Sequence, residues 1–420
     1  MSEAHHLASE RPGLHGVEPV QRPIPRVAIE AFCETPELAL VLRRAAQDRH
    51  LAKAHLGVHM GGIAAAVAAY GERATPGLIL AETRLFGADL LHALEQLAAV
   101  CDARARVIVI GHTNDIGIYR ELIRQGVSDY LVAPLEPATL IESVARLYAD
   151  PEAPPIGRTV AFAGARGGAG SSTVAHNVAW CISEHLNEDA TILDLDLPFG
   201  TGGLDFNQDP AQGLADALLA PERVDDVLLD RLTVECTDRL TLLAAPATLD
   251  RDYMIEPETY EAVVDAVRRT VPCMILDLPH VWTAWSRKLL VGADEIVVTA
   301  TPDLASLRNA KNLLDVLAAA RPGDAPAHLV INQVGVAGRP EIPVRDFAET
   351  VGREPALILP FDPALFGAAA NNGQMLGQID GSARAATGLR HLAAVVSGRG
   401  AALQPARPAS LLRRFLGRKG

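Results

Sequence analysis

The chain has 420 residues, of which 49% are hydrophobic, so it is long and apolar enough to form more than one buried core. Its formal net charge of −13 disfavours nucleic acid as a partner, because binding to a phosphate backbone needs clustered lysine and arginine. The five cysteines show no paired spacing, which argues against a disulfide framework or a cysteine metal site.

The first 25 residues contain several histidines and prolines without hydrophobic periodicity, and we expect them to form a disordered arm. They lack the basic segment and apolar core of a secretion signal. No apolar run in the chain reaches the roughly 18 residues that span a bilayer. The sequence therefore predicts a cytoplasmic protein.

Residues 26–149 alternate between apolar runs typical of buried strands and stretches with helical periodicity. Because strands separated by helices usually pair in parallel, we expect a small doubly wound parallel sheet. The expected strands include 26–30, 77–81, 106–110 and 129–132, and the expected helices include 36–46, 119–125 and 137–148.

The end of this region, residues 126–134 (GVSDYLVAP), resembles the closing part of response-regulator receiver domains. Receivers carry an acid pair, a phosphorylatable aspartate, a hydroxyl and a lysine at four strand ends. Without the acid pair and the lysine, the resemblance implies a pseudo-receiver that is not phosphorylated and serves docking or dimerisation. Glu82, at the aspartate position, either mimics a phosphorylated residue or is a solvated carboxylate. The residues at the four positions are Phe32 with Cys33, then Glu82, Thr113 and Ala133.

Residues 150–158 are rich in proline and predict a linker, and a second α/β domain is expected over 159–396. This domain opens with a strand over 159–163, a glycine-rich segment and a helix over 172–182. In such an arrangement, backbone N–H groups and the positive end of the helix dipole face an anion. The segment therefore indicates a phosphate-binding loop, with a purely structural turn as the alternative.

The loop sequence, RGGAGSST over residues 166–173, departs from the usual G-x-x-x-x-G-K-[ST] pattern. Ser171 replaces the lysine that reaches the outer phosphates, whereas Ser172 keeps the hydroxyl that binds magnesium. The residues expected to bind nucleotide here are Arg166, Gly167, Gly168, Ala169, Gly170, Ser171, Ser172 and Thr173.

Three acids follow apolar strands downstream of the loop. Asp194 and Asp196 lie two residues apart in a strand expected over 191–196, so both should face the same side. Asp277 follows a run that is apolar on both faces, as in a buried parallel strand that ends at a ligand crevice. Each acid alone is more often a helix cap or a surface residue. Together with the loop, they indicate handling of water and magnesium.

These motifs make residues 158–395 similar to the ATPases with a deviant Walker A loop, the MinD and ParA group. The loop resembles K-G-G-x-G-K-[ST]-[ST], Asp194 and Asp196 resemble the switch I acids, and residues 277–279 resemble Walker B and the start of switch II. Residues 301–308 resemble the T-x-P-x-x-x-S-x-R segment. The resemblance implies a P-loop fold with ATP and Mg²⁺ as ligands.

The same resemblance implies roles for individual residues. Ser172 and Asp277 are the expected magnesium residues, and Asp196 is the expected catalytic residue, positioning the attacking water. Asn332 is expected to contact adenine, with the capping of a turn as the alternative. Pro360 belongs to the loop expected to cover the base.

The departures from the family pattern concern positive charge. Arg166 stands where the family carries a lysine that reaches across a nucleotide-bound dimer. The missing lysine at Ser171 costs roughly 1.5–3 kcal/mol of binding but about 10²–10³ in turnover. We therefore expect an ATP-binding homodimer with slow or undetectable hydrolysis. The alternatives are an active positioning ATPase, in which another residue compensates, and a structural module with an empty pocket.

A pseudo-receiver followed by a lysine-deficient MinD-like domain resembles the CpaE/TadZ family of pilus-assembly proteins. This resemblance implies a scaffold that localises the Flp/Tad pilus and secretion machinery at a cell pole. Residues 397–420 read as a flexible tail, and its tip over 411–419 alternates apolar and basic residues, which resembles the membrane-targeting tip of MinD. Peripheral contact with the inner membrane is one expectation for the tip, and a frayed tail or a protein-docking peptide is the other.

Overall fold

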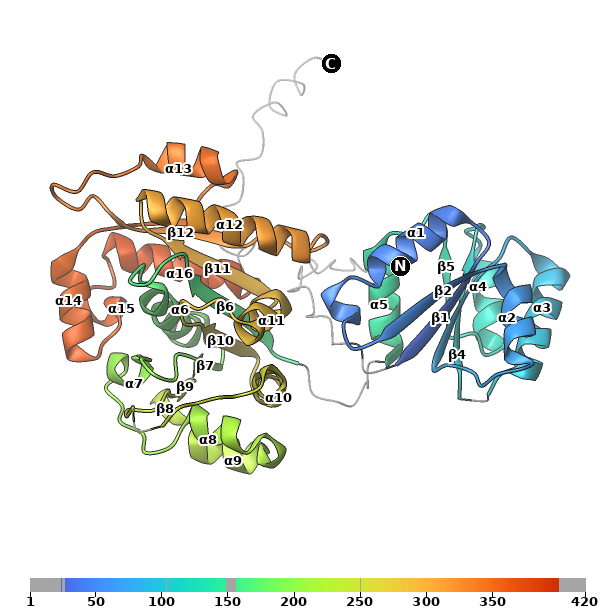
Figure 1. Cartoon of the computed structure of the whole chain (residues 1–420), viewed down its shortest axis with the longest axis horizontal. Coiled ribbons are helices and arrows are strands. Elements are labelled where there is room, and N and C mark those ends of the chain that lie inside the picture. The colour runs from blue at the N-terminus through green and yellow to red at the C-terminus, as the bar shows by residue number, and fades with distance from the viewer. Residues whose placement is uncertain (1–23, 25–26, 103, 149–155, 250, 400–420) are drawn as a thin grey trace, which may run out of the picture.

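The computed structural model describes residues 24, 27–102, 104–148, 156–249 and 251–399. These residues form two α/β units, each built around its own sheet (Figure 1). The five-stranded sheet has the order β2-β1-β3-β4-β5, and the eight-stranded sheet has the order β13-β12-β11-β6-β10-β7-β9-β8. Both sheets are parallel apart from the antiparallel pair β8 and β9. The predicted fold class, two doubly wound parallel-sheet units, is confirmed.

The first unit alternates strands and helices from Ala28 to Tyr148. Its strands are β1 (Ala28–Cys33), β2 (His55–Met60), β3 (Leu78–Glu82), β4 (Arg106–Gly111) and β5 (Asp129–Val132). Its helices are α1 (Pro36–Ala45), η1 (Arg49–Leu51), α2 (Gly62–Tyr70), α3 (Gly87–Val100), α4 (Ile116–Arg124) and α5 (Pro137–Tyr148). Helices α1 and α5 cover one face of the sheet, and α2, α3 and α4 cover the other.

Local signals explain most of these bounds. Helix α1 begins after Thr35, whose side chain accepts a hydrogen bond from the N–H of Leu38. Helix α4 begins at Ile116 because Asp115 caps it, so it starts before the 119–125 segment expected from periodicity. Strand β2 was not predicted, because it is an edge strand with partly exposed side chains and no apolar alternation.

The second unit starts at Arg158 and carries the glycine-rich loop. Its strands are β6 (Arg158–Gly164), β7 (Ala190–Asp194), β8 (Val234–Thr237), β9 (Leu240–Leu243), β10 (Cys273–Asp277), β11 (Glu295–Ala300), β12 (His328–Val334) and β13 (Leu357–Pro360). Its longer helices are α6 (Ser171–Leu186), α10 (Pro257–Val267), α11 (Ala284–Gly292), α12 (Leu304–Ala320), α13 (Val344–Val351), α14 (Pro363–Asn372) and α16 (Arg384–Val396). Its shorter helices are α7 (Gly202–Asp205), α8 (Leu214–Leu219), η2 (Pro221–Arg223), α9 (Asp226–Leu232) and α15 (Leu376–Ile379).

Strand β6 lies in the middle of the larger sheet, between β10 and β11. Its residues are buried on both faces, because α6 and α16 pack on one side and α10, α11 and α12 on the other (Figure 1). The β7, β10 and β6 strands run in parallel, with Asp277 paired in register with Asp194 and Phe162. The loop after β6 and the acids at the ends of β7 and β10 therefore meet at one edge of the sheet.

The expectation that Asp194 and Asp196 lie in one strand is wrong. Strand β7 ends at Asp194, and Asp196 lies in the turn that follows. The carbonyl of Asp196 accepts hydrogen bonds from the N–H groups of Phe199 and Gly200. Alternation with a period of two ends where the chain leaves the sheet, so the two carboxylates occupy different environments.

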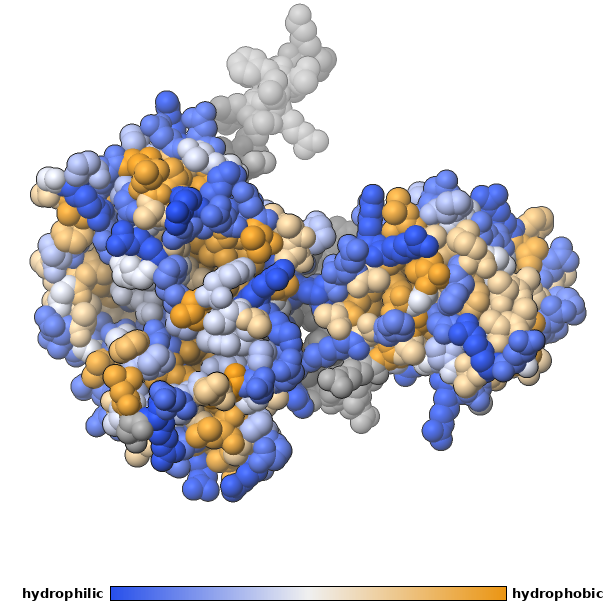
Figure 2. Space-filling model, in the orientation of Figure 1, coloured by the Kyte–Doolittle hydropathy of each residue, from blue (hydrophilic) through white to orange (hydrophobic). Residues whose placement is uncertain are grey.

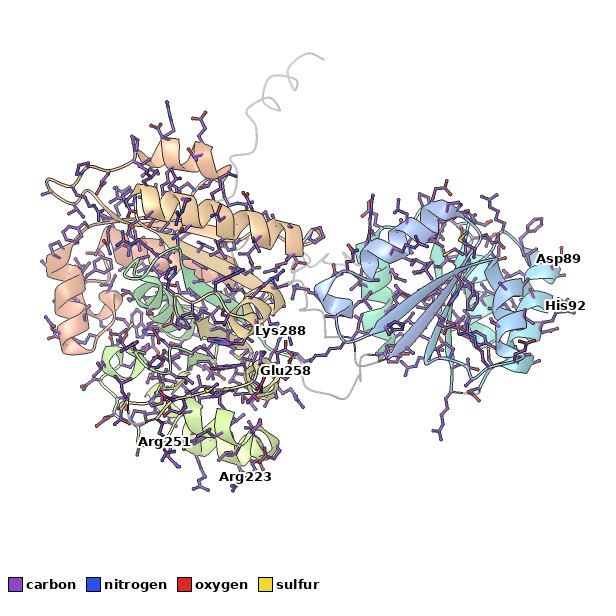
Figure 3. The ribbon with its side chains drawn as sticks, in the orientation of Figure 1. Asp89, His92, Arg223, Arg251, Glu258 and Lys288 are labelled. Atoms are coloured by element: carbon purple, nitrogen blue, oxygen red, sulfur yellow. The ribbon has the colours of Figure 1, made fainter. Side chains whose placement is uncertain are left out.

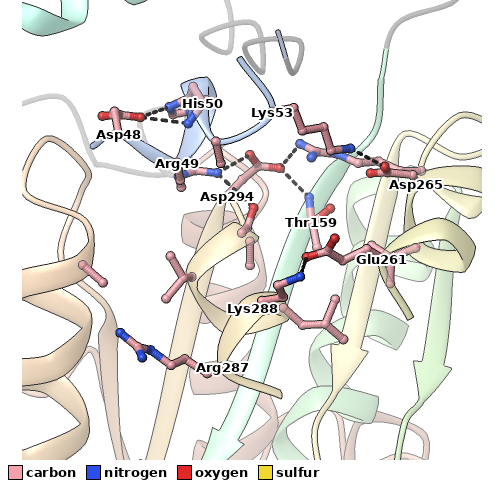
Figure 4. Close-up of a pocket in the computed structure, with 18 of the residues that line it drawn as sticks. Asp48, Arg49, His50, Lys53, Thr159, Glu261, Asp265, Arg287, Lys288 and Asp294 are labelled. Atoms are coloured by element: carbon pink, nitrogen blue, oxygen red, sulfur yellow. Dashed lines mark hydrogen bonds and ion pairs between the residues drawn. The ribbon is translucent and has the colours of Figure 1, made fainter. Parts of the chain in front are cut away.

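The two units contact each other at the end of the larger sheet opposite the glycine loop. Arg49 of η1 places its Nε 2.6 Å from Asp324 Oδ2 and its Nη1 2.9 Å from the Gly292 carbonyl oxygen. Lys53 Nζ lies 2.6 Å from Asp265 Oδ2. A cavity of about 710 Å³ lies beside these ion pairs (Figure 4).

The visible surface of both units mixes hydrophilic residues with small apolar areas (Figure 2). Helices α10 and α11 are joined near the interface by Lys288, whose Nζ lies 3.0 Å from Glu258 Oε1 (Figure 3). Among the described residues, no helix is both long and apolar enough to cross a membrane. Three predicted segments lie largely outside the described residues. They are the arm over 1–25, of which only Ile24 is described, most of the linker, and residues 400–420 of the tail.

Candidate functional site

The glycine-rich loop joins β6 to α6 with a backbone that only glycine adopts easily. Gly168 has a φ of 77° and Gly170 a φ of 87°, both in the left-handed region. A Cβ at Gly170 would also collide with the amide nitrogen of Asn332. The close approach of β12 to the loop therefore requires glycine at position 170.

The loop presents backbone donors at the first turn of α6. Within the described part of the chain, the N–H groups of Gly168, Gly170 and Ser171 donate to no protein acceptor, and those of Ser172 and Thr173 are equally free. The first N–H groups of a helix have no partner inside the helix. Together with the helix dipole, they form a site that suits a phosphate chain.

Asn332, which was predicted to contact adenine, and its neighbour Gln333 hold the loop from the side. Asn332 Nδ2 donates to the Ala169 carbonyl at 2.9 Å, and Gln333 Nε2 donates to the Gly168 carbonyl at 3.1 Å. Asn332 and Pro360 line a cavity of about 380 Å³ beside the loop, together with Gly170 and Thr173. The contact of Asn332 with adenine stays a prediction, since part of its amide is already used by the loop.

The guanidinium of Arg166 contacts Asp303 and the carbonyl of Gly167. Its Nη1 lies 3.3 Å from Asp303 Oδ2, and 48% of its side chain is exposed. Asp303 caps α12 by accepting from the N–H of Ser306 and also accepts from the Thr301 hydroxyl. Arg166 is therefore tied to the 301–308 segment and does not replace the loop lysine in this arrangement.

One predicted magnesium residue, Asp277, and the predicted nucleotide-binding residue Ser171 each carry a polar atom without a partner in the part of the chain that the structure describes. Ser171 Oγ and Asp277 Oδ1 are buried and have no hydrogen-bond partner among the described residues. Ser172, next to Ser171, is half-buried at the start of α6. A hydroxyl and one carboxylate beside phosphate oxygens are the usual protein donors for Mg²⁺, which keeps several of its waters. The residues present therefore fit a magnesium ion.

His176 is a part of this site that the sequence did not indicate. Its side chain is completely buried on α6, with Nδ1 2.7 Å from Asp205 Oδ2 and Nε2 3.2 Å from Asp277 Oδ2. The Nε2 contact has the length of an ion pair but lacks the alignment of a hydrogen bond. Burial alone would lower the pKa of His176, but the Asp205 and Asp277 carboxylates outweigh burial and raise it to about 10. A lone histidine on an apolar helix face carries no sequence signal for such contacts.

The two acids predicted to belong to switch I differ in environment. Asp194 is completely buried and accepts from the Gly202 N–H at 2.9 Å; burial and the nearby Asp277 charge raise its pKa to about 7. Asp196 is half-buried, and burial raises its pKa as well. Asp196 is the more accessible of the two, which agrees with the role expected for it but does not test that role.

The residues compared above with receiver domains also lie near one edge of the smaller sheet. Glu82 is completely buried, so the expectation of a solvated carboxylate is wrong. Its oxygens accept from the N–H groups of Glu34 and Thr35 at 2.7 and 2.8 Å and from the Thr35 hydroxyl at 2.7 Å. His112 Nε2 lies 3.1 Å from the same carboxylate. Glu82 therefore ties the loops after β1 and β4 to the end of β3.

Comparisons with known proteins assign the larger unit to a family. A family profile described as cellulose biosynthesis protein BcsQ matches residues 158–396. The septum site-determining protein MinD of Synechocystis sp. is 24% identical over 196 residues, which is 44% of this chain and 66%, just under two thirds, of that protein.

Solved structures of MinD and ParA proteins are also similar to this chain. A ParA family ATPase from Chlorobium tepidum is 25% identical, with a TM-score of 0.52 over 56% of this chain and 98% of the other. MinD from Pyrococcus horikoshii, complexed with Mg-ADP, shares the fold at 17% identity and a TM-score of 0.51, over 57% of this chain and 96% of the other.

The pilus assembly protein CpaE from Caulobacter crescentus is 48% identical to this chain in sequence. The match spans 31% of this chain and 98% of that one, with a TM-score of 0.30. The profile match covers more than half of the chain, and the sequence identity with CpaE extends over nearly all of that protein's solved chain. The chain therefore belongs to the BcsQ family of MinD/ParA-type proteins, and it is similar in sequence to CpaE over 31% of its length.

Proposed function

We propose that the protein binds ATP with Mg²⁺ beside the glycine loop and acts in that state as a dimeric scaffold that localises pilus-assembly machinery, with weak or no ATP hydrolysis. The observation that carries the proposal is the set of free N–H groups of Gly168, Gly170, Ser171, Ser172 and Thr173 in the loop and at the start of α6. The ParA family ATPase and the Mg-ADP complex of MinD share this fold and support the choice of ligand.

The residues of the chain divide the work of binding. The loop amides hold the phosphates, Asn332 and Pro360 form the wall for the base, and Ser172 and Asp277 hold the magnesium ion. Magnesium, when bound, neutralises negative charge on the phosphate oxygens. Asp196 is half-buried, whereas Asp194 and Asp277 are buried, and it orients water.

Slow hydrolysis follows from the lack of a positively charged side chain at the phosphates. Ser171 supplies no ammonium at the phosphates, and Arg166 is held by Asp303 at the surface. A group that stabilises transition-state charge is worth about 10²–10³ in turnover. Because nearly half of the Arg166 side chain is exposed, it remains free to contact a second copy of the chain.

The partner and the location are proposed from the similarity to CpaE, which is a pilus assembly protein. The smaller unit serves as a docking surface for that machinery at a cell pole. The tail over 397–420 provides peripheral contact with the inner membrane; residues 400–420 lie outside the described part of the chain.

Light scattering of the full chain without nucleotide, with ADP and with ATP plus Mg²⁺ tests the proposal. We expect the mass to rise from one to two copies of the 44.5 kDa chain only with ATP. A mass that does not respond to nucleotide would contradict the scaffold role. Phosphate release measured in parallel distinguishes the active positioning ATPase, which would turn over ATP as fast as lysine-bearing relatives.

A further inference from the structure

Strand β12 is irregular beside the glycine loop. Between Ile331 and Val334, β12 advances three residues while its neighbour β13 advances two, from Ile358 to Pro360. The extra residue belongs to the segment 332–333, which is also the segment that contacts the loop. An extra residue of this kind is a β-bulge, and bulges occur next to functional sites because they change the direction of a side chain.

The bulge places two neighbouring side chains on the same side of β12. In a regular strand, successive side chains point to opposite faces, so Asn332 and Gln333 could not both contact the loop. Here both do. Asn332 Nδ2 donates to the Ala169 carbonyl at 2.9 Å, and Gln333 Nε2 donates to the Gly168 carbonyl at 3.1 Å. Two consecutive peptide groups of the loop are therefore fixed from β12.

Fixing these carbonyls also fixes the N–H groups of the loop. In a planar trans peptide, the N–H group of the next residue points opposite to the carbonyl. Asn332 therefore orients the N–H of Gly170, one of the free donors of the loop. Gln333 holds the preceding peptide, in which the N–H of Ala169 donates to the carbonyl of Arg166 and closes the turn.

Gln333 makes its contact from an unfavourable backbone conformation. Its φ is 57°, in the left-handed region. The other non-glycine residues with a positive φ in the described part of the chain are Asn187 and Asn207, and asparagine is enriched in that region. A strained residue persists only where its surroundings hold it in place, and such residues cluster at ligand sites.

Arg339 and Glu341 hold Gln333 in place. Arg339 Nη2 donates to the backbone carbonyl of Gln333, and Nη1 lies 3.4 Å from Gln333 Oε1. With Oε1 facing the guanidinium, Nε2 is left to face the loop. Arg339 Nη2 also lies 2.9 Å from Glu341 Oε1, and Glu341 accepts from the N–H groups of Gly335 and Val336. The turn after β12 is thereby closed around the guanidinium.

We propose that Gln333 is a positioning residue for the phosphate chain, held by Arg339 and Glu341 so that the loop N–H groups are oriented before the nucleotide arrives. Donors that are already ordered lose less freedom when a ligand binds. This matters most in a loop that has Ser171 in place of lysine and binds through its backbone. Gln333 contacts the loop, so every ligand that carries the phosphate chain gains from it. The inference rests on the proposed binding of ATP.

Gln333→Gly in the full chain separates this role from a purely structural one. Glycine adopts the left-handed region freely, so relief of strain offsets the lost side-chain hydrogen bonds. We expect the Tm without nucleotide to stay within about 2 °C of the wild type or to rise. The affinity for ATP with Mg²⁺, measured by calorimetry, should fall at least about threefold. Inorganic triphosphate, titrated as a competitor of ATP, should lose affinity by the same factor.

Arg339→Gln is the second variant. It removes the guanidinium, whereas Glu341 keeps its hydrogen bonds to the N–H groups of Gly335 and Val336. We expect the affinity for ATP to fall at least about twofold, because Gln333 loses the contacts that hold it. Arg345→Gln is the matched control, because 90% of the Arg345 side chain is exposed. It should bind ATP like the wild type.

Equal affinity for ATP in Gln333→Gly, Arg339→Gln and the wild type would overturn the inference and leave the proposed function intact. A loss for ATP without a loss for inorganic triphosphate would also overturn it, because Gln333 would then contact the base. A Tm that falls together with the affinity would show that Gln333 only supports the fold. A wild type that binds no ATP would overturn the proposed function and, with it, the inference.

Discussion

Ser171 decides the expected rate of hydrolysis. Its hydroxyl is buried at the start of α6 and has no partner among the described residues. Ser171→Lys places an ammonium at this point, and we expect ATP turnover to rise about 10²–10³-fold, as measured by phosphate release. Ser171→Ala should match the wild type. An unchanged rate in Ser171→Lys would mean that another residue already supplies the charge.

Asp194 gives the site a pH dependence. Folding raises the pKa of Asp194 from 3.8 to about 7. Between pH 3.8 and 7, the folded protein therefore keeps a proton on Asp194 that the unfolded chain has released. The contribution to stability is full below pH 3.8 and is lost as the pH rises through 7. We expect the unfolding free energy of the wild type, relative to Asp194→Asn, to fall by roughly 1–4 kcal/mol between pH 4 and 7. A difference that stays constant across this range in urea titrations would contradict the assignment.

At the scale of elements, the hydrogen bonds of Glu82 join three parts of the smaller unit. Glu82→Ala leaves the N–H groups of Glu34 and Thr35 without their acceptor and weakens the cap of α1. We expect faster hydrogen–deuterium exchange over residues 27–50, by about tenfold or more, and no change in the second unit. Glu82→Gln, which keeps one acceptor oxygen, should show a smaller effect. Equal exchange in all three proteins would show that Glu82 does not hold these loops.

The sequence predicted elements whose signals are local. Helix α5 has the expected bounds, and β5 spans the four residues predicted for it, because an apolar period or run defines each. Strand β2 and helices α2 and α3 were not identified. Strand β2 lies at the sheet edge, and α2 is rich in alanine and apolar on most of its surface, so neither shows a clear period.

The parts of the candidate site that short sequence patterns mark could be predicted. The loop, Asp277 and the parallel strands that bring them together follow from composition and spacing. His176 and Asp205 were missed because they are far apart in the sequence. His176 contacts Asp205, 29 positions further along the chain, and Asp277, 101 positions further along, and no short pattern records such contacts. The burial of Glu82 was missed for the same reason, since its partners lie about 48 residues away.

For the whole molecule, Arg49 fixes how the two units meet. It is 14% exposed and contacts Asp324, Asp294 and the carbonyl of Gly292 at the end of α11. Arg49→Ala removes these contacts between the units, whereas Asp324 keeps its ion pair with Arg321 and Asp294 keeps its ion pair with Arg268. We expect a larger radius of gyration by small-angle X-ray scattering. Arg44→Ala, at an exposed site on α1, is the control and should scatter like the wild type.

The central claim is that a loop of backbone donors binds ATP without the lysine. Calorimetry of ATP with Mg²⁺ binding to the wild type and to Gly170→Ala tests it most directly, because a Cβ at Gly170 collides with Asn332 and opposes a φ of 87°. The account predicts one nucleotide per chain for the wild type and an affinity at least about tenfold weaker for Gly170→Ala. No binding by the wild type, or equal affinity in the two proteins, would contradict it.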